Sequence, residues 1–285
     1  MGVGEVGERL RRSTILVRNG GESGAGSGVV WDASGVIVTN AHVAGTGDLT
    51  IEFWDGRSAQ ARLDRRDLRR DLAILRVQSS GLEPAMPGDS GRIRVGELVI
   101  AVGNPLGFIG ALSTGVVHAI GPYPGVGRQE FIQTTARLAP GNSGGPLADA
   151  RGRVIGINTA VVSGGLGLAV PADAIGRLLS FGPPAELGVT IRPVRIRGPV
   201  GGIALLVLGI SAGGAAEYAS LRVGDLLVGA DGKRFTSVDG LQEAMDRAEG
   251  RSLTIQFLRG NDRGDDERKR EVTVQIMRYR MGVAA

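Results

Sequence analysis

The chain has 285 residues, 42% of them hydrophobic, so it is long enough for two domains with buried cores. It has no cysteine, which excludes disulfides, thiol catalysis and cysteine-ligated metals, and its two histidines argue against a histidine-based metal site. The formal net charge is +4, and arginines are interspersed with acids, as in residues 62–71 and 261–271. This mixture indicates solvated surfaces. We therefore expect no metal, no cofactor and no nucleic-acid partner.

The apolar runs are too short for a membrane span. The longest, such as residues 203–210, fall far below the length that crosses a bilayer. Residues 1–17 contain no apolar stretch after their basic residues, so no signal peptide is visible. The compartment stays open, because the chain is cytoplasmic if complete and extracytoplasmic if a leader has been removed.

The first part of the chain reads as an all-β domain. Residues 5–12 predict one or two helical turns, and short apolar segments bounded by turn residues follow. Such a series is typical of a β-sandwich or β-barrel. The expected strands are residues 14–17, 27–32, 35–40, 49–54, 72–77, 98–103, 113–120, 130–135, 153–162 and 166–171.

A change of composition marks a second domain. A helical period first occurs at residues 171–180, and the Pro-Pro and Gly residues of 181–188 then indicate a linker. We expect a first domain over residues 1–180, a linker over 181–187 and a small α+β domain over 188–285. The elements expected in the latter are strands at 188–196, 201–210, 223–233, 252–260 and 270–280, and helices at 212–219 and 237–248.

Ser143 stands in an unusual run, "RLAPGNSGGPLAD", with glycines on both sides. The run could be a plain turn, or a backbone shape that only glycine allows. A serine hydroxyl becomes a nucleophile when a base takes its proton. His42 follows a strand-like run and can face a cleft, whereas His118 lies inside an apolar strand and is expected to be structural.

A catalytic imidazole also needs a carboxylate partner, and Asp71 is the best candidate. It stands where an arginine-rich stretch changes to the apolar run 72–77, whereas Asp64 and Asp67 lie within that stretch and are expected to face solvent. The chain order His, Asp, Ser is that of chymotrypsin and agrees with an all-β domain.

Several motifs resemble the HtrA/Deg family of serine proteases. They are "TNAHV", "DLAILRV", "GNPLG", "IQTTARLAPGNSGGPL", "GRVIGINTA" and "LGLAVPAD". The resemblance implies a trypsin-like double β-barrel followed by a PDZ domain. It also implies His42 as general base, Asp71 as its orienting partner and Ser143 as nucleophile. The backbone N–H groups of Gly141 and Ser143, with Asn142 between them, would form the oxyanion hole.

The resemblance also assigns binding residues in the first domain. Leu138 would wall the S1 pocket, and Thr159, Ala160 and Val161 would form the edge that pairs with the substrate backbone. Their apolar character, without an acidic residue, predicts cleavage after small-to-medium aliphatic residues.

The second domain resembles a bacterial PDZ domain through "SLRVGDLLVGADGK" and "AELGV". Its carboxylate-binding loop would include Leu187, Gly188 and Val189, and Leu241 and Met245 are candidate pocket residues that could instead only fill the core. The expected partners are unfolded or damaged proteins and C-terminal peptides. The alternative is a peptide-binding chaperone or scaffold with a resting or inactive protease domain.

Two departures from the family pattern are visible. Members commonly carry an acidic residue where Thr135 stands, just before the Ser143 turn. The N-terminal segment also lacks the aromatic cluster that often joins these enzymes as trimers, so a homotrimer is implied by the resemblance alone.

Overall fold

The computed structural model divides into two compact units, Met1–Ser180 and Phe181–Ala285. Most of the expected linker, residues 182–186, lies outside the described residues. The structure describes residues 2–20, 25–45, 48–124, 126, 129–181, 187–196, 202–237, 240–248, 252–260 and 268–275.

The first barrel closes on itself in the order β1-β2-β3-β6-β5-β4. Neighbouring strands are antiparallel, and their alternate apolar side chains fill an interior that includes Ile15, Ile37 and Leu75, each fully buried. The strands are β1 Thr14–Asn19, β2 Ala25–Val30, β3 Val36–Thr39, β4 Leu49–Glu52, β5 Ser58–Asp67 and β6 Leu72–Val77.

The second barrel follows the order β11-β8-β9-β10-β13-β12, and pairing of β11 with β12 closes it. The short strand β7, Met86–Pro87, adds to β12 in parallel. The two barrels belong to one compact unit. The turn that carries Ser143 lies between β10 and β11. The strands are β8 Leu98–Gly103, β9 Ala111–Pro122, β10 Glu130–Thr134, β11 Pro146–Asp149, β12 Arg153–Val161 and β13 Gly167–Pro171.

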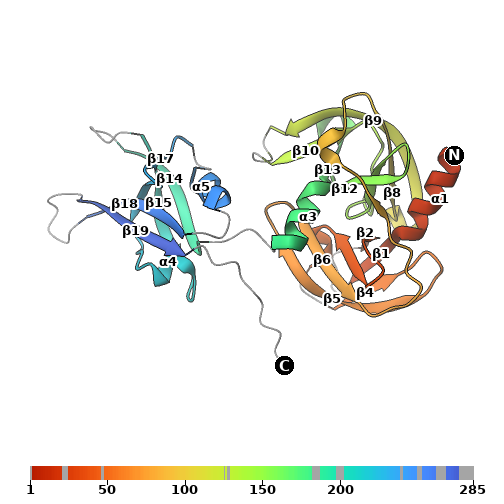
Figure 1. Cartoon of the computed structure of the whole chain (residues 1–285), viewed down its shortest axis with the longest axis horizontal. Coiled ribbons are helices and arrows are strands. Elements are labelled where there is room, and N and C mark those ends of the chain that lie inside the picture. The colour runs from red at the N-terminus through yellow and green to blue at the C-terminus, as the bar shows by residue number, and fades with distance from the viewer. Residues whose placement is uncertain are drawn as a thin grey trace. The chain divides into compact units, whose positions relative to one another are not determined.

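Two helices, α1 and α3, pack on the first unit. Helix α1, Val3–Ser13, lies beside β8 (Figure 1) and buries Val6 and Leu10 in the apolar cluster that also contains residues of the second barrel. Helix α3, Ala172–Phe181, follows β13 and buries Ile175 and Leu178 in the same cluster. None of the helices in the described ranges is long and apolar enough to span a bilayer.

In its described residues, the second unit is a sheet with two helices. Its strand order is β14-β15-β16-β18-β19, with the short β17 (Lys233–Arg234) paired to β16. The core lies where α5, Gly240–Ala248, and α4, Ala215–Tyr218, pack on the sheet. The main strands are β14 Val189–Ile196, β15 Gly202–Ile210, β16 Leu226–Ala230, β18 Ser252–Arg259 and β19 Arg268–Gln275.

The expected fold class is confirmed, since an all-β double barrel precedes a small α+β unit. The boundaries differ in detail. Helix α1 is longer than the predicted 5–12, and Gly2 caps its start with its N–H bonded to Glu5. Helix α5 spans Gly240–Ala248, and residues 238–239 of the helix predicted from 237 lie outside the described residues. Residues 276–280 of the last expected strand lie outside the described residues.

The anchoring of α1 gives a test of the fold. Leu10 is 2% exposed, so Leu10→Ala is expected to lower the free energy of unfolding by about 2–5 kcal/mol, through lost apolar contact and a cavity. The measurement is urea unfolding followed by circular dichroism. Val3→Ala is the control, because Val3 lies in the same helix but is 47% exposed; equal losses in the two variants would contradict the packing described here.

Candidate active site

Three chain segments bring the predicted catalytic residues to the junction of the two barrels. His42 lies in α2, the single turn Ala41–Ala44 directly after β3, and Asp71 follows β5 at the end of a tight turn. Both belong to the first barrel. Ser143 belongs to the second barrel, but its carbonyl oxygen accepts a 2.7 Å hydrogen bond from the N–H of Ser27 in β2.

His42 and Asp71 are joined by three hydrogen bonds. The ring Nδ1 lies 2.9 Å and 2.8 Å from the two carboxylate oxygens, and the backbone N–H of His42 donates to Oδ1 at 3.0 Å. A neutral ring that donates through Nδ1 leaves Nε2 as a proton acceptor. The His42 side chain is 53% exposed, so that acceptor faces the solvent-accessible site.

The backbone of Asp71 has φ +54°, in the left-handed region that non-glycine residues rarely adopt and that Asp tolerates better than most. The buried amide of Asn40 donates to the Asp71 carbonyl at 2.8 Å and so stabilises this turn. The expectation that Asp67 faces solvent is wrong. Asp67 is 2% exposed because it accepts the backbone N–H groups of Arg69 and Arg70, which form the turn leading to Asp71.

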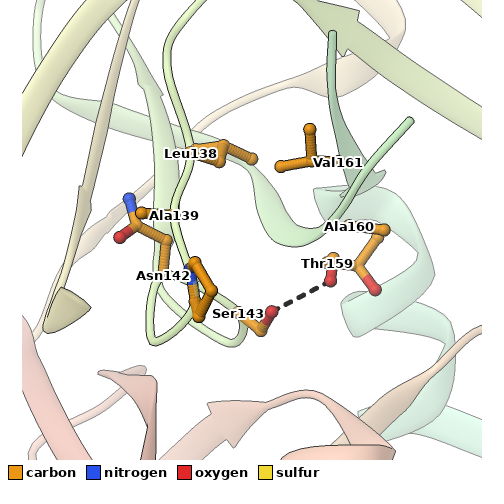
Figure 2. A pocket seen from close by; sticks show the side chains of 8 residues that line it. Leu138, Ala139, Asn142, Ser143, Thr159, Ala160 and Val161 are labelled. Atoms are coloured by element: carbon orange, nitrogen blue, oxygen red, sulfur yellow. Dashed lines mark hydrogen bonds between the residues drawn. The ribbon is translucent and has the colours of Figure 1, made fainter. Parts of the chain in front are cut away.

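Thr159 contacts both halves of the site. Its hydroxyl donates to Oδ2 of Asp71, and its carbonyl oxygen accepts a 3.0 Å hydrogen bond from the Ser143 hydroxyl (Figure 2). Burial would raise the pKa of Asp71, but the hydrogen bonds from His42 and Thr159 outweigh it and hold the pKa below its ordinary value of 3.8. The carboxylate therefore stays ionised at neutral pH.

The Ser143 hydroxyl makes no hydrogen bond to the His42 ring in the described part of the chain, because it is directed to the Thr159 carbonyl. For Ser143 to act as a nucleophile with His42 as its base, the hydroxyl would first have to rotate about the Cα–Cβ bond. Thr159 holds that hydroxyl and the Asp71 carboxylate at the same time, which places all three candidate residues in one site.

The glycines around Ser143 take conformations that other residues avoid. Gly141 has φ +104° and Gly144 has φ +88°. A Cβ on Gly144 would collide with the backbone oxygen of Ser27 and the hydroxyl of Thr39. Within the described residues, the N–H groups of Gly141 and Ser143 have no hydrogen-bond acceptor, so both donors are available for an oxyanion. Asn142 between them is buried, and its N–H bonds to Ala139.

Ser27 fixes the carbonyl side of the same turn. Its hydroxyl donates to the Gly141 carbonyl at 2.7 Å and accepts the N–H of Asn104 at 2.8 Å. Ser27 and Asn104 are almost completely buried, and the Asn104 amide also donates to the Ile15 carbonyl. These contacts join strands of both barrels beneath the turn. The fixed Gly141 carbonyl sets the plane of the peptide unit that lies between the N–H groups of Gly141 and Ser143.

A pocket of about 260 Å³ opens beside Ser143. Figure 2 shows Leu138 and Val161 pointing toward one another across it. The structure thus brings together the four predicted substrate-binding residues with Ser143, and none of the eight described residues that line the pocket is acidic. The lining residues are Leu138, Ala139, Pro140, Asn142, Ser143, Thr159, Ala160 and Val161.

The predicted residues of the second unit also gather in one place. Leu187, Leu241 and Met245 are buried in one apolar cluster, against which Val189 packs. Gly188 has φ +73°, and its carbonyl accepts the N–H of Ser211 at 2.9 Å. The near-complete burial of Leu241 and Met245 also fits a core role, so the alternative considered for them stays open.

Two other residues singled out in the sequence lie apart from the Ser143 turn. His118 lies in β9 on its exposed face, as expected for a residue outside the site. Thr135 is exposed, and its hydroxyl accepts the N–H of Val116 at 3.0 Å. Thr135 thereby pairs the end of β10 with β9 ahead of the turn.

Sequence reasoning missed the contacts of Ser27, Asn104 and the Thr159 hydroxyl. Ser27 was read only as part of a strand, because its partner Gly141 lies 114 residues away and leaves no local signal. Thr159 was predicted for its backbone edge, while its side chain contacts Asp71. The αL backbone of Asp71 was equally invisible in the sequence.

Two closed six-stranded barrels, with a histidine–aspartate pair from one and a serine turn from the other, define a trypsin-like serine peptidase. Residues 26–157 match the family model of a trypsin-like peptidase domain, and residues 206–259 match that of a PDZ domain. The peptidase fold, the enzyme class and the PDZ unit expected from the sequence are thus confirmed.

Relatives and solved structures agree. "Putative serine protease HhoA" of Synechocystis sp. is 36% identical over 90% of this chain and 72% of its own length. "Protease Do-like 1, chloroplastic" of Arabidopsis thaliana is 34% identical over 88% of this chain, which spans 64% of that relative. The solved structure of the HtrA-type protease AlgW with a decapeptide has a TM-score of 0.70 and 26% identity, covering 96% of this chain and 98% of that chain. The chain belongs to the HtrA/Deg family of serine proteases.

The Ser27 contact gives a test of the site. Ser27→Ala removes the hydroxyl that holds the Gly141 carbonyl, so the peptide plane between the candidate N–H donors of Gly141 and Ser143 loses its fixed direction. Because one misplaced oxyanion donor costs about 100- to 1,000-fold in kcat, we expect a loss of about 10- to 100-fold with little change in KM. Steady-state kinetics on a chromogenic peptide measure both.

Ser34→Ala is the matched control, since Ser34 is an exposed serine that bonds only locally to Asp32. It should keep the kinetics of the unaltered protein. A Ser27→Ala variant that raised KM and kept kcat would contradict the role assigned to the contact.

Thr159 gives a test of the Asp71 environment. Thr159→Val removes one of the hydrogen bonds that lower the Asp71 pKa, and Thr159→Ser retains it. A depressed native pKa stabilises the fold above the unfolded value and stops doing so as pH falls through the native one. Urea unfolding at pH 2.5–7 should therefore show a destabilisation by Thr159→Val that is full at neutral pH and shrinks below about pH 3.8. A loss independent of pH would contradict this assignment.

Proposed function

We propose that this chain is an endopeptidase that cleaves unfolded or damaged proteins after small-to-medium aliphatic residues. The observation that carries the proposal is the pocket of about 260 Å³ with no acidic lining residue, directly beside Ser143 and the His42–Asp71 pair. A pocket for a basic residue needs a counter-charge, and an apolar one gains from burying aliphatic surface.

The chemistry would follow the serine-peptidase sequence. His42 Nε2 takes the proton of the Ser143 hydroxyl as Oγ attacks the substrate carbonyl carbon, and the N–H groups of Gly141 and Ser143 receive the negative oxygen. His42 then gives that proton to the amine leaving group, which departs from the acyl-enzyme. A water molecule attacks the acyl carbon in the same way, with His42 again as base.

Asp71 would act through His42. Its carboxylate holds Nδ1–H and stabilises the imidazolium that forms during attack. The hydrogen bonds that lower the Asp71 pKa keep this charge present at neutral pH. The substrate backbone would pair as an added strand with the segment Thr159–Val161. This pairing requires an extended and hence unfolded substrate.

The PDZ unit would bind C-terminal peptides. Its match to the PDZ model and the apolar cluster around Leu187, Leu241 and Met245 support an apolar terminal residue. The N–H groups near Leu187 to Val189 would receive the carboxylate. The related AlgW structure contains a decapeptide, which is a property of that protein. Assembly as a homotrimer rests on family resemblance alone.

The alternative is a peptide-binding chaperone or scaffold whose protease unit is in a resting or inactive state. One observation favours it: the Ser143 hydroxyl bonds to the Thr159 carbonyl and not to His42. The alternative predicts peptide binding with no hydrolysis, so a single digestion separates the two functions.

The experiment is digestion of casein by the unaltered protein and by Ser143→Ala, with and without a peptide that has a free C-terminal carboxylate. We expect cleavage only by the unaltered protein, faster with the peptide, because Ser143 supplies the nucleophile and the PDZ unit supplies control. Mass spectrometry of the products should show Val, Ala, Leu or Ile before most cleaved bonds.

Equal rates for the two proteins would exclude Ser143 as nucleophile. Cleavage mainly after Arg or Lys would exclude the proposed pocket. Absence of cleavage in both, with retained binding of unfolded casein, would favour the chaperone alternative.

A further inference from the structure

The first strand of the PDZ unit has an unusual outer edge. β14 lies at one end of the sheet order, and among the described strands it pairs only with β15. Its sequence, "VTIRPVRI", contains Pro193 in the middle. Proline has no N–H to donate, and within sheets it is confined to edge positions. The direction of Pro193 therefore decides what can pair with this edge.

The hydrogen bonds of β15 show that direction. The N–H of Val207 donates to the Asp225 carbonyl at 2.9 Å, and the Val207 carbonyl accepts the N–H of Gly224 at 2.9 Å. Asp225 and Gly224 immediately precede β16, so the polar groups of Val207 point away from β14. In an antiparallel pair, the N–H and C=O groups of two directly opposed residues either bond to each other or both point away from the partner strand. Val207 opposes Ile191, so the N–H and C=O groups of Ile191 point away from β15, toward the outer edge of the sheet.

The same alternation places Pro193 on the outer edge. Leu205 lies two residues before Val207 in a regular stretch of β15, and it opposes Pro193. The backbone polar groups of Pro193 and Leu205 therefore point away from each other. Arg192 and Leu206, which lie between this pair and the Ile191–Val207 pair, form the hydrogen-bonded pair. The outer edge thus presents complete N–H and C=O pairs at Val189 and Ile191, then a carbonyl without a donor at Pro193. The proline ring occupies the space where that donor would be.

We propose that Pro193 ends main-chain recognition at the fourth residue of a bound C-terminal peptide. This rests on the proposed peptide binding. With its carboxylate at the start of β14, the peptide runs antiparallel, and its last residue lies opposite Val189. The third residue from the end then exchanges two hydrogen bonds with Ile191. The fifth lies opposite Pro193, where its carbonyl finds no donor and the ring turns the chain away.

The side-chain contacts of the strand agree with this limit. Val189 and Ile191 pack against the apolar cluster that includes Leu241 and Met245. Pro193 is exposed, so no described apolar surface replaces the missing hydrogen bond. The PDZ unit therefore selects the terminal residues and takes no affinity from the chain that precedes them. The PDZ unit would thus recognise partners by a free apolar C-terminus, with almost any sequence before the last four residues.

The test is a length series. A peptide selected from a C-terminal library with free carboxylates is truncated to three, four, five and seven residues. Binding to full-length Ser143→Ala protein, which avoids cleavage, is measured by fluorescence anisotropy and competition. We expect affinity to rise up to four residues and to change less than about twofold from four to seven.

Pro193→Thr restores the N–H on a strand-forming residue. It should bind the seven-residue peptide about 3- to 10-fold more tightly than the four-residue one, as one added hydrogen bond allows. Arg192→Thr is the matched control, because that backbone faces β15, and its length dependence should stay flat. Thermal unfolding of both variants shows whether they are folded.

N-methyl peptides test the same point without altering the protein. Methylation of the backbone nitrogen of the third residue from the C-terminus should abolish binding. Methylation of the backbone nitrogen of the fifth residue should change the affinity less than about twofold. If affinity keeps rising through the fifth residue, or if methylation there weakens binding strongly, the role of Pro193 is wrong while peptide binding stands. If no free-carboxylate peptide binds, the proposed peptide binding fails and this inference falls with it.

Discussion

The site depends on the hydrogen bonds of Ser27, a small buried residue in the first barrel. Its N–H holds the Ser143 carbonyl, its hydroxyl holds the Gly141 carbonyl, and its own carbonyl accepts the hydroxyl of Thr39. Buried polar groups are costly when unpaired, so this arrangement strongly favours a single geometry. Because the serine turn belongs to the second barrel, its shape is set only when the two barrels are packed together.

Thr159 couples the two remaining parts of the chemistry. Its hydroxyl donates to the Asp71 carboxylate and its carbonyl accepts the Ser143 hydroxyl, so a shift of this one residue changes both contacts. The end of β12 that carries it also lines the pocket beside Ser143, through Ala160 and Val161. Under the proposed function, substrate pairing and orientation of the reacting groups would both depend on this strand end.

The architecture was predictable because its signals are local. Short apolar runs between turn residues predicted a β-sandwich or β-barrel, and the resemblance to the HtrA/Deg family singled out the double barrel. The glycines around Ser143 indicated a turn, plain or special, which the structure shows with positive φ at Gly141 and Gly144. The Ser27 contacts were not predictable, because a serine in a strand looks alike whether it faces solvent or a carbonyl 114 residues away. The same holds for Asp67, whose burial follows from a turn that the charged sequence conceals. Residue types identified the candidates, and only the assembled barrels show their partners.

The position of α1 has a consequence for the time course of synthesis. This helix is made before both barrels, yet Val6 and Leu10 are buried with residues of the second barrel, and Arg9 donates to the Arg151 carbonyl 142 residues later. At ribosomal rates of about 5–20 residues per second, roughly 7–28 s pass before that partner exists. During this interval the apolar face of α1 lacks part of its native cover, namely the residues of the second barrel in the same cluster. The first barrel can close early, but the double barrel is completed only after its last strands have left the ribosome.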